Sequence, residues 1–215
     1  MESRERRKSN VKRVPKRAIY EEAQIHAILD RNFLAHIGFV YNGYPVVIPT
    51  LYARDGHDLL IHGAAISRML KTLSEGIEVS VSIAEVNALV LAKSAFHHSM
   101  NYESVVLFGK GDLVPDEQKV QALKCISDHL IPLRWEESRQ PNEKELKATD
   151  IVRIKVDEVS AKRRSGPPID DKVDQDLPIW SGLIPIQRVF STPIPSEESG
   201  NSLPESARML IEKTK

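Results

Sequence analysis

Ser67, Arg68 and Lys71 are the residues whose types and spacing most directly suggest binding chemistry. They follow an apolar run at 58–61 and the small residues 63–65, at the start of a segment with helical spacing. A serine at a helix start can accept hydrogen bonds from the first backbone amides, and free amides there attract anions. Arg68 and Lys71 lie three residues apart and share one helix face. Such a group would suit a phosphate, with the small residues giving a ligand close access to the backbone.

The same spacing also fits a capped surface helix whose cations lie in solvent, so it does not decide between the two interpretations. A second polar group supports a ligand site. The stretch AKSAFHHSMNYESVVLFG, residues 92–109, places His97 and His98 between apolar segments. Neighbours on an extended chain point to opposite sides and no third ligand has suitable spacing, so we expect no metal site. A polar wall for a flat heteroaromatic ligand is favoured, although a structural role explains either histidine alone.

The composition predicts one globular domain with extensions. The chain has 215 residues, of which 41% are hydrophobic and 28% charged. Thirty basic and thirty acidic side chains cancel, so the molecule has no overall attraction to nucleic acid or membrane. The single Cys125 excludes an internal disulfide and a zinc site built on cysteines. No apolar run is long enough for a membrane span or a signal segment, which predicts a soluble, cytoplasmic protein.

Charge and proline content suggest the domain boundaries. Residues 1–17 contain eight Lys or Arg against two Glu, a surplus of six positive charges. Such a block is typical of a solvated, flexible arm, and a nucleic-acid contact is the disfavoured alternative. We therefore expect a basic arm at 1–17, a folded domain at 18–187 and a C-terminal extension at 188–215. The extension is rich in proline and polar residues, with a helical pattern in PESARMLIEK.

Strand and turn patterns dominate the folded domain. Asn42-Gly43 predicts a tight hairpin, and a second turn is expected at Asp55-Gly56. Pro45 and Pro49 lie in the strand between these turns and predict an unpaired edge. Further strands are expected at 77–84, 87–94, 104–114 and 150–163, and helices at 20–30, 67–75 and 116–130. Six or seven strands joined mostly by hairpins predict a mainly antiparallel barrel with flanking helices.

The order of four motifs resembles a known family: PVVIPTLYARDG, LLIHGAAISRMLKTL, VSVSIAEVNALVLAKSAFHHSMNYESVVLFGKG and LPIWSGLIP. Over residues 18–187 the chain is similar to pyridoxamine 5′-phosphate oxidase-related, FMN-binding split-barrel proteins. It is most similar to the flavin-nucleotide-binding branch that includes nitroimidazole-resistance-type proteins. The resemblance implies a mainly β, homodimeric split barrel that binds FMN at the subunit interface.

The resemblance also implies roles for particular residues. Ser67, Arg68 and Lys71 would bind the FMN phosphate, and His62 and His98 are candidate catalytic proton donors. The whole implied cofactor site comprises Ile48, Pro49, Thr50, Leu51, His62, Ser67, Arg68, Lys71, His98, Ser99, Asn101, Tyr102 and Trp180, of which 48–51 would present backbone groups to the isoalloxazine. In the oxidases an Arg-x-His pattern follows Trp-x-Gly. After Trp180-Ser181-Gly182 this chain continues with Leu-Ile-Pro-Ile. We therefore do not assign pyridoxamine-phosphate oxidation to it.

Several functional hypotheses follow from the resemblance. The first is an FMN-dependent oxidoreductase, with NADH or NADPH as the candidate donor and an unidentified small molecule as acceptor. The alternative is a non-catalytic FMN-binding protein that stores or senses the cofactor or docks a partner. A heme-binding split barrel is disfavoured, because the phosphate-binding residues have no role there and heme needs an axial ligand.

Overall fold

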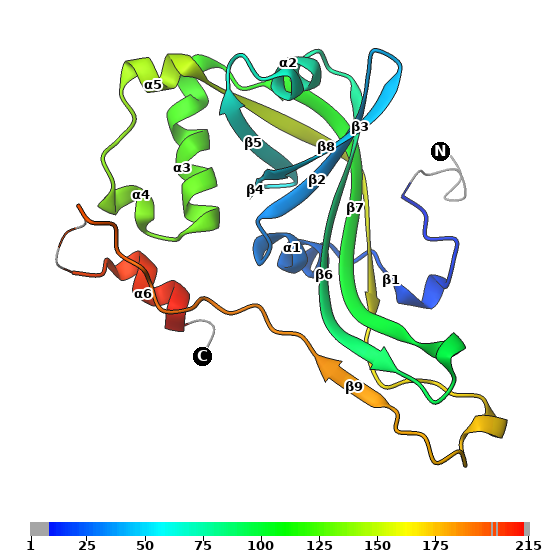
Figure 1. Ribbon diagram of the computed structural model, residues 1–215. Coiled ribbons are helices and arrows are strands. Elements are labelled where there is room, and N and C mark those ends of the chain that lie inside the picture. The colour runs from blue at the N-terminus through cyan, green and yellow to red at the C-terminus, as the bar shows by residue number, and fades with distance from the viewer. Residues whose placement is uncertain (1–8, 199, 201, 213–215) are drawn as a thin grey trace. The chain divides into compact units, whose positions relative to one another are not determined.

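The computed structural model describes residues 9–198, 200 and 202–212, which form mainly antiparallel strands with short helices between them (Figure 1). These residues divide into two compact units. Unit 1 contains the chain up to Asn32, Val81–Leu107 and Glu158–Gln187; unit 2 contains Phe33–Ser80, Phe108–Asp157 and the chain from Arg188. Three long strands contribute residues to both units: β6 (Glu78–Leu91), β7 (Ser99–Leu113) and β8 (Thr149–Arg164).

Unit 1 is a sheet with one helix. Its strands follow the order β9-β6-β7-β8-β1, where β1 is Ala18–Ile19 and β9 is Gly182–Pro185. The predicted helix at 20–30 is confirmed as α1, Glu22–Asp30. Its buried side chains are Ile25, Ile28 and Leu29, spaced three and four apart as one apolar helix face requires.

Unit 2 contains the remaining elements. Its strands are β2 (Leu34–Tyr41), β3 (Tyr44–Leu51), β4 (Ala53–Asp55) and β5 (Asp58–Ala64), and its helices are α2 (Arg68–Ser74), α3 (Lys119–Leu130), α4 (Arg134–Glu137), α5 (Glu143–Ala148) and α6 (Glu205–Glu212). The strands follow the order β3-β2-β6-β7-β8-β5-β4. The pairs β2–β3, β4–β5 and β5–β8 are antiparallel.

Two predicted turns of unit 2 are confirmed. Asn42 and Gly43 have φ angles of 49° and 79°, the left-handed conformation that both central residues of a type I′ hairpin need. Gly56, at φ 63°, lies in the turn between β4 and β5. These turns join β2 to β3 and β4 to β5, the two antiparallel pairs that are neighbours in the sequence.

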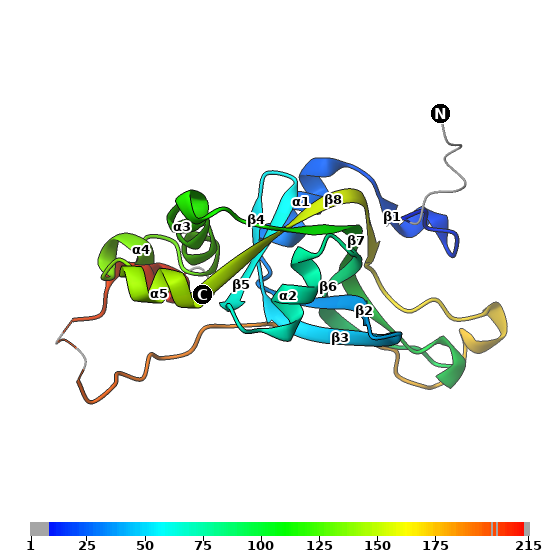
Figure 2. The ribbon, with the colours of Figure 1, turned by 90° about the horizontal axis from the view of Figure 1, so that it is seen from above.

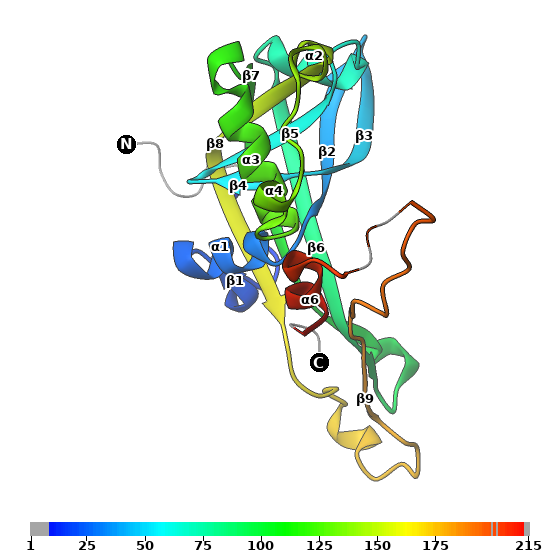
Figure 3. The same ribbon diagram turned by 90° about the vertical axis from the view of Figure 1, so that its left-hand side faces the viewer.

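The core of unit 2 lies where α3 covers β4 and β5 (Figure 3). Its buried cluster consists of Ala53, Leu60, Val114, Ala122, Ile126 and Ile151. The strands β7 and β8 approach unusually closely beside it. A Cβ atom on Gly109 would lie 2.0 Å from the backbone oxygen of Lys155, so only glycine fits there.

The structure corrects one strand prediction. Residues 77–84 and 87–94 were expected to form two partner strands, but β6 runs without interruption from Glu78 to Leu91. No glycine or proline lies between the two segments, so nothing turns the chain there. Along β6 the buried residues are first odd-numbered, Val79, Val81 and Ile83, and then even-numbered, Ala88 and Val90, so the buried face of the strand changes between them.

Candidate functional site

The predicted site residues fall in both units. Unit 2 holds Ile48, Pro49, Thr50, Leu51, His62, Ser67, Arg68 and Lys71, and unit 1 holds His98, Ser99, Asn101, Tyr102 and Trp180. In unit 2 the structure brings three groups of these residues onto neighbouring elements: β3, the end of β5 and the start of α2. The geometry of each unit is described separately below.

Ser67 occupies the N-cap position of α2, but its side chain does not cap the helix. Its backbone oxygen accepts the amide of Lys71 at 3.0 Å, whereas its hydroxyl makes no capping hydrogen bond. The expectation that Ser67 caps the helix through its side chain is therefore wrong. The hydroxyl is not engaged by the first turn, and the first amides of α2 have no acceptor within the helix.

Arg68 and Lys71 are both exposed on the first turn of α2. The guanidinium carbon of Arg68 lies 5.0 Å from the centre of the Tyr41 ring, at the end of β2. This stacking fixes the plane of the guanidinium while leaving its N–H edge free to donate. Within the part of the chain that the structure describes, no carboxylate pairs with either cation. Two unpaired cations beside a free serine hydroxyl form a site suited to a phosphate.

Gly63 does not leave room for a ligand. A Cβ atom there would lie 3.3 Å from the Cδ1 atom of Leu70, because α2 packs beside β5 at this point (Figure 2). The amide of Ala65 donates to the oxygen of Ala148 at 2.9 Å. Gly63 therefore positions α2 against the sheet, which corrects our expectation that this glycine admits a ligand to the backbone, whereas Ala64 is exposed.

β3 has the free edge that its prolines predict. Within the described residues it pairs only with β2. Tyr52 continues the ladder by donating its amide to the oxygen of Phe33 at 3.2 Å. Because N–H and C=O of one residue point to the same side of an antiparallel strand, the even-numbered residues of β3 face β2.

The odd-numbered residues of β3 therefore face outward. Their free carbonyls belong to Pro45, Val47, Pro49 and Leu51, whereas only Val47 and Leu51 can offer an N–H. Of the predicted stretch 48–51, Pro49 and Leu51 have backbone groups that point away from β2. Ile48 and Thr50 use theirs in the β2 ladder. This edge offers two acceptors and one donor, a set that matches a ring with alternating C=O and N–H groups.

His62 lies on β5, where it pairs with Ile151 of β8. Its Nδ1 atom is buried and has no hydrogen-bond partner among the described residues. Burial lowers the pKa of this imidazole from its usual value, because desolvation disfavours the charged ring. His62 is therefore a neutral imidazole with an unused nitrogen, which is rare for a buried polar group without a ligand.

His97 and His98 have separate partners in unit 1. The Nε2 atom of His97 lies 3.2 Å from a carboxylate oxygen of Asp171. The Nδ1 atom of His98 accepts the amide of Ala92 at 3.1 Å. Because Nδ1 accepts, the proton of a neutral His98 must lie on Nε2. His98 can donate a hydrogen bond through this nitrogen but cannot use it to bind a metal.

The other predicted site residues of unit 1 differ in whether their side chains are free to contact a ligand. Asn101 is buried, and its side chain is used by the guanidinium of Arg164 and the oxygen of Gly166. Tyr102 is half-buried and Ser99 is exposed at the start of β7. The Trp180 ring lies over Gly182 and is 65% exposed, so one of its faces is free to meet another group.

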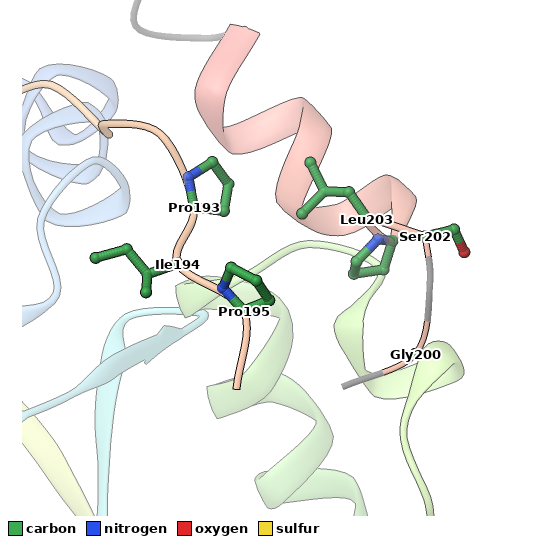
Figure 4. A pocket seen from close by; sticks show the side chains of 7 residues that line it. Pro193, Ile194, Pro195, Gly200, Ser202 and Leu203 are labelled. Carbon is green, nitrogen blue, oxygen red and sulfur yellow. The ribbon is translucent and has the colours of Figure 1, made fainter. Parts of the chain in front are cut away.

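A hollow of about 600 Å³ lies elsewhere in unit 2, lined by Pro193, Ile194, Pro195, Gly200, Ser202, Leu203 and Pro204 (Figure 4). It contains none of the predicted site residues and no charged side chain. It is therefore not the phosphate site. Tyr41 is the contact of that site that sequence reasoning missed, because a tyrosine at a hairpin end carries no signal of which cation will stack on it.

Comparison with known proteins defines the class of fold. The chain is 31% identical to the FAD and heme binding protein from Mycobacterium smegmatis, over 91% of this chain and 97% of that one, with a TM-score of 0.88. It is 34% identical to the flavocytochrome Anf3 from Azotobacter vinelandii, over 93% and 94% of the two chains, with a TM-score of 0.87. A Bacteroides thetaiotaomicron protein described as a candidate for 5-nitroimidazole antibiotic resistance shares the fold at 19% identity, over 67% and 85% of the chains, with a TM-score of 0.56.

The family model described as pyridoxamine 5′-phosphate oxidase matches residues 21–163. The chain therefore belongs to the pyridoxamine 5′-phosphate oxidase-related, flavin-binding split-barrel family, and the predicted fold of mainly antiparallel strands with flanking helices is confirmed. No curated protein matches the chain. Among the described residues, no helix combines the length and the hydrophobicity that crossing a bilayer requires.

Proposed function

We propose that this protein is a flavin-binding oxidoreductase that binds the flavin phosphate through Ser67, Arg68 and Lys71. The observation that carries the proposal is the state of these side chains: a hydroxyl that does not cap its helix and two cations without a described carboxylate partner. FMN and FAD share the phosphate on the ribityl chain, so the site suits either. The name of the Mycobacterium smegmatis relative favours FAD over the FMN expected from the sequence.

The chain's own groups have distinct tasks in this proposal. A bound flavin would supply the redox chemistry by accepting a hydride and passing on electrons. Arg68 and Lys71 bind its phosphate, and the outward groups of Pro49 and Leu51 hydrogen-bond the ring edge. The Nε2–H of His98 would donate a hydrogen bond to the bound ring, because its Nδ1 accepts the amide of Ala92, and the lowered pKa of His62 makes that residue a poor proton donor at neutral pH.

Heme is a second candidate cofactor, because the name of the Mycobacterium smegmatis relative includes it and the Azotobacter vinelandii relative is named a flavocytochrome. An axial ligand must be an unprotonated nitrogen that no hydrogen bond occupies. Nδ1 of His62 has no hydrogen-bond partner but is buried, so a heme would reach it only after a local rearrangement, and His98 does not meet the condition through Nε2 while its Nδ1 accepts the amide of Ala92. If heme binds, His62 is the residue of these two that fits the iron. Exchange of His62 for glutamine would then shift or abolish the Soret band.

A homodimer is part of the proposal. On the β6–β9 ladder Leu89 lies directly opposite Ile184. The backbone amide of Ile186 donates to the oxygen of Asn87, the next position of the same face. These three side chains are 45% to 47% exposed and form an apolar strip without a charge between them. Apolar strips of this kind are typical of subunit interfaces. We propose that a second copy of the chain covers this strip.

The absorption spectrum of the purified, dialysed protein tests the cofactor, with mass spectrometry of whatever heat releases. Two flavin bands with FAD or FMN in the supernatant would support the proposal, and an added Soret band would support the flavocytochrome form. A colourless protein that ignores both added flavins would contradict it. Stopped-flow reduction by NADH and NADPH then separates an enzyme from a storage or sensor protein, which either donor should reduce only slowly.

A further inference from the structure

Unit 1 carries a concentration of positive charge that the flavin proposal does not use. Residues 12–17 contain Lys12, Arg13, Lys16 and Arg17, and β8 ends with Lys162, Arg163 and Arg164. The two segments lie against each other, since Ala18 of β1 pairs with Lys162 of β8. Ser9 anchors the first segment further along, where its amide and its hydroxyl each lie 3.0 Å from one oxygen of Glu158.

Few of these charges are neutralised. Arg163 pairs with the carboxylate of Glu103. Within the described ranges no carboxylate lies within ion-pairing distance of Lys12, Arg13, Lys16, Arg17 or Arg164. Lys162 bonds only to the backbone oxygen of Arg13, so the pairing of β1 with β8 collects six described cations without a carboxylate partner from two parts of the sequence almost 150 residues apart.

Arg164 is the unusual member because it is only 8% exposed. Its guanidinium donates to the side-chain oxygen of Asn101 and, at 3.3 Å each, to the backbone oxygens of Gly166 and Pro167. All three acceptors are neutral, and its Nε–H has no acceptor in the described part of the chain. A buried charge is costly unless an opposite charge accompanies it, and a guanidinium cannot escape that cost by losing its proton.

The surroundings of Arg164 reinforce this point. Burial is the main cause that lowers its pKa, and the nearby charge of Arg17 acts in the same direction. Asn101 also donates to the oxygen of Gly166 at 3.2 Å, which holds the guanidinium and its loop in one arrangement. Gly166 has φ 102°, and no heavy atom lies within 4 Å of where its Cβ would be. The guanidinium of Arg164 is thus held in place by a loop that has open space on the Cβ side of Gly166.

We propose that Arg164 and Arg17 form an anion-binding site in unit 1 for a small ligand that carries a phosphate or carboxylate group. Forked guanidinium groups match the oxygens of such anions in geometry and in charge. A nucleic acid fits less well, because the neighbouring segment offers only one aromatic side chain, Tyr20, whose hydroxyl already accepts the amide of Val11.

The anion has two possible sources: a free metabolite in solution, or an acidic group of a bound cofactor. Calorimetric titration of the protein as isolated with sodium pyrophosphate, at low ionic strength, measures the first. Titration of the apoprotein with FAD and with FMN measures the second. The pyrophosphate titration does not depend on the flavin proposal and reports on the site even if the protein is colourless.

The variants are Arg17→Ala, Arg17→Lys and the control Lys12→Ala. Arg17 makes no side-chain bond in the described structure but is half-buried, whereas Lys12 is an exposed cation of the same segment, so Arg17→Lys is needed to separate loss of charge from loss of packing. We expect Arg17→Ala to weaken pyrophosphate or FAD by at least about tenfold and Lys12→Ala by less than about threefold. Arg17→Lys should restore part of the loss, because it restores the charge without the fork.

Loss of pyrophosphate binding alone would assign the site to a free anion, and loss of FAD affinity would assign it to the cofactor. The proposal is overturned if Arg17→Ala and Lys12→Ala match each other in every titration. It is also overturned if wild-type protein binds a short single-stranded oligonucleotide and both variants lower that affinity equally, since this would indicate a diffuse polyanion surface.

Discussion

Removal of the two α2 cations gives the sharpest test of the phosphate site. Arg68 and Lys71 each offer a charge-assisted hydrogen bond, which contributes about 1.5–3 kcal/mol when its partner is buried. Both side chains are exposed, so the lower end of that range applies. At about 1.4 kcal/mol per factor of ten, each alanine variant should weaken FMN or FAD by about tenfold, and the double variant by about a hundredfold.

The assay is fluorescence titration of apoprotein with FMN and with riboflavin, which lacks the phosphate. Wild-type protein should prefer FMN, whereas the Arg68→Ala/Lys71→Ala variant should bind both flavins equally, with riboflavin affinity unchanged. Lys144→Ala is the matched control, since it removes an exposed cation from α5 of the same unit. A folded double variant that keeps the wild-type preference for FMN would refute the assignment. Equal loss of both flavins would show that the change acts on the fold and not on the phosphate.

Three further predictions concern stability and assembly. Burial lowers the pKa of His62, so the unfolded chain takes up a proton more readily than the folded protein does. Stability is therefore lost as pH falls below about 6.5. The His62→Leu variant should show a smaller fall in melting temperature between neutral pH and about pH 5. Leu89→Asp with Ile184→Asp should convert a dimer to a monomer in light scattering, and a wild-type protein that is already monomeric would contradict the interface. Gly109→Ala should cost at least about 2–3 kcal/mol in denaturant unfolding because its Cβ would overlap a backbone oxygen, whereas Gly200→Ala, with open space around it, should cost less than about 1 kcal/mol.

Local patterns predicted much of the fold. The Asn42-Gly43 turn, helix α1 and the proline-marked edge of β3 follow from rules that act within a few residues. Helix α5 was missed although its signal is present: Asn142 and Glu145 form a capping box that the spacing N-x-x-E announces. The continuity of β6 was missed because the change of buried face at 84–87 resembles the end of one strand and the start of another, although no glycine or proline lies there to turn the chain.

The sequence predicted which types of residue form the site, but not which other residues they contact. Arg68 and Lys71 were identified from helical spacing, yet the packing of Leu70 onto Gly63 and the stacking of Arg68 on Tyr41 depend on which distant elements meet. The occupation of Asn101 by Arg164 likewise joins residues 63 positions apart. Sequence spacing reports on neighbours along a helix or strand, whereas such contacts depend on the tertiary arrangement.

The free edge of β3 also affects how this protein behaves at high concentration. An exposed strand normally invites another strand to pair with it, and sheets grow into aggregates by that route. Along β3 the two prolines leave carbonyls at four outward positions but N–H donors at only Val47 and Leu51. A second strand aligned there would find half of the N–H donors missing. Exchange of Pro45 and Pro49 for threonine should therefore produce a chain that folds but forms aggregates rich in intermolecular β-sheet.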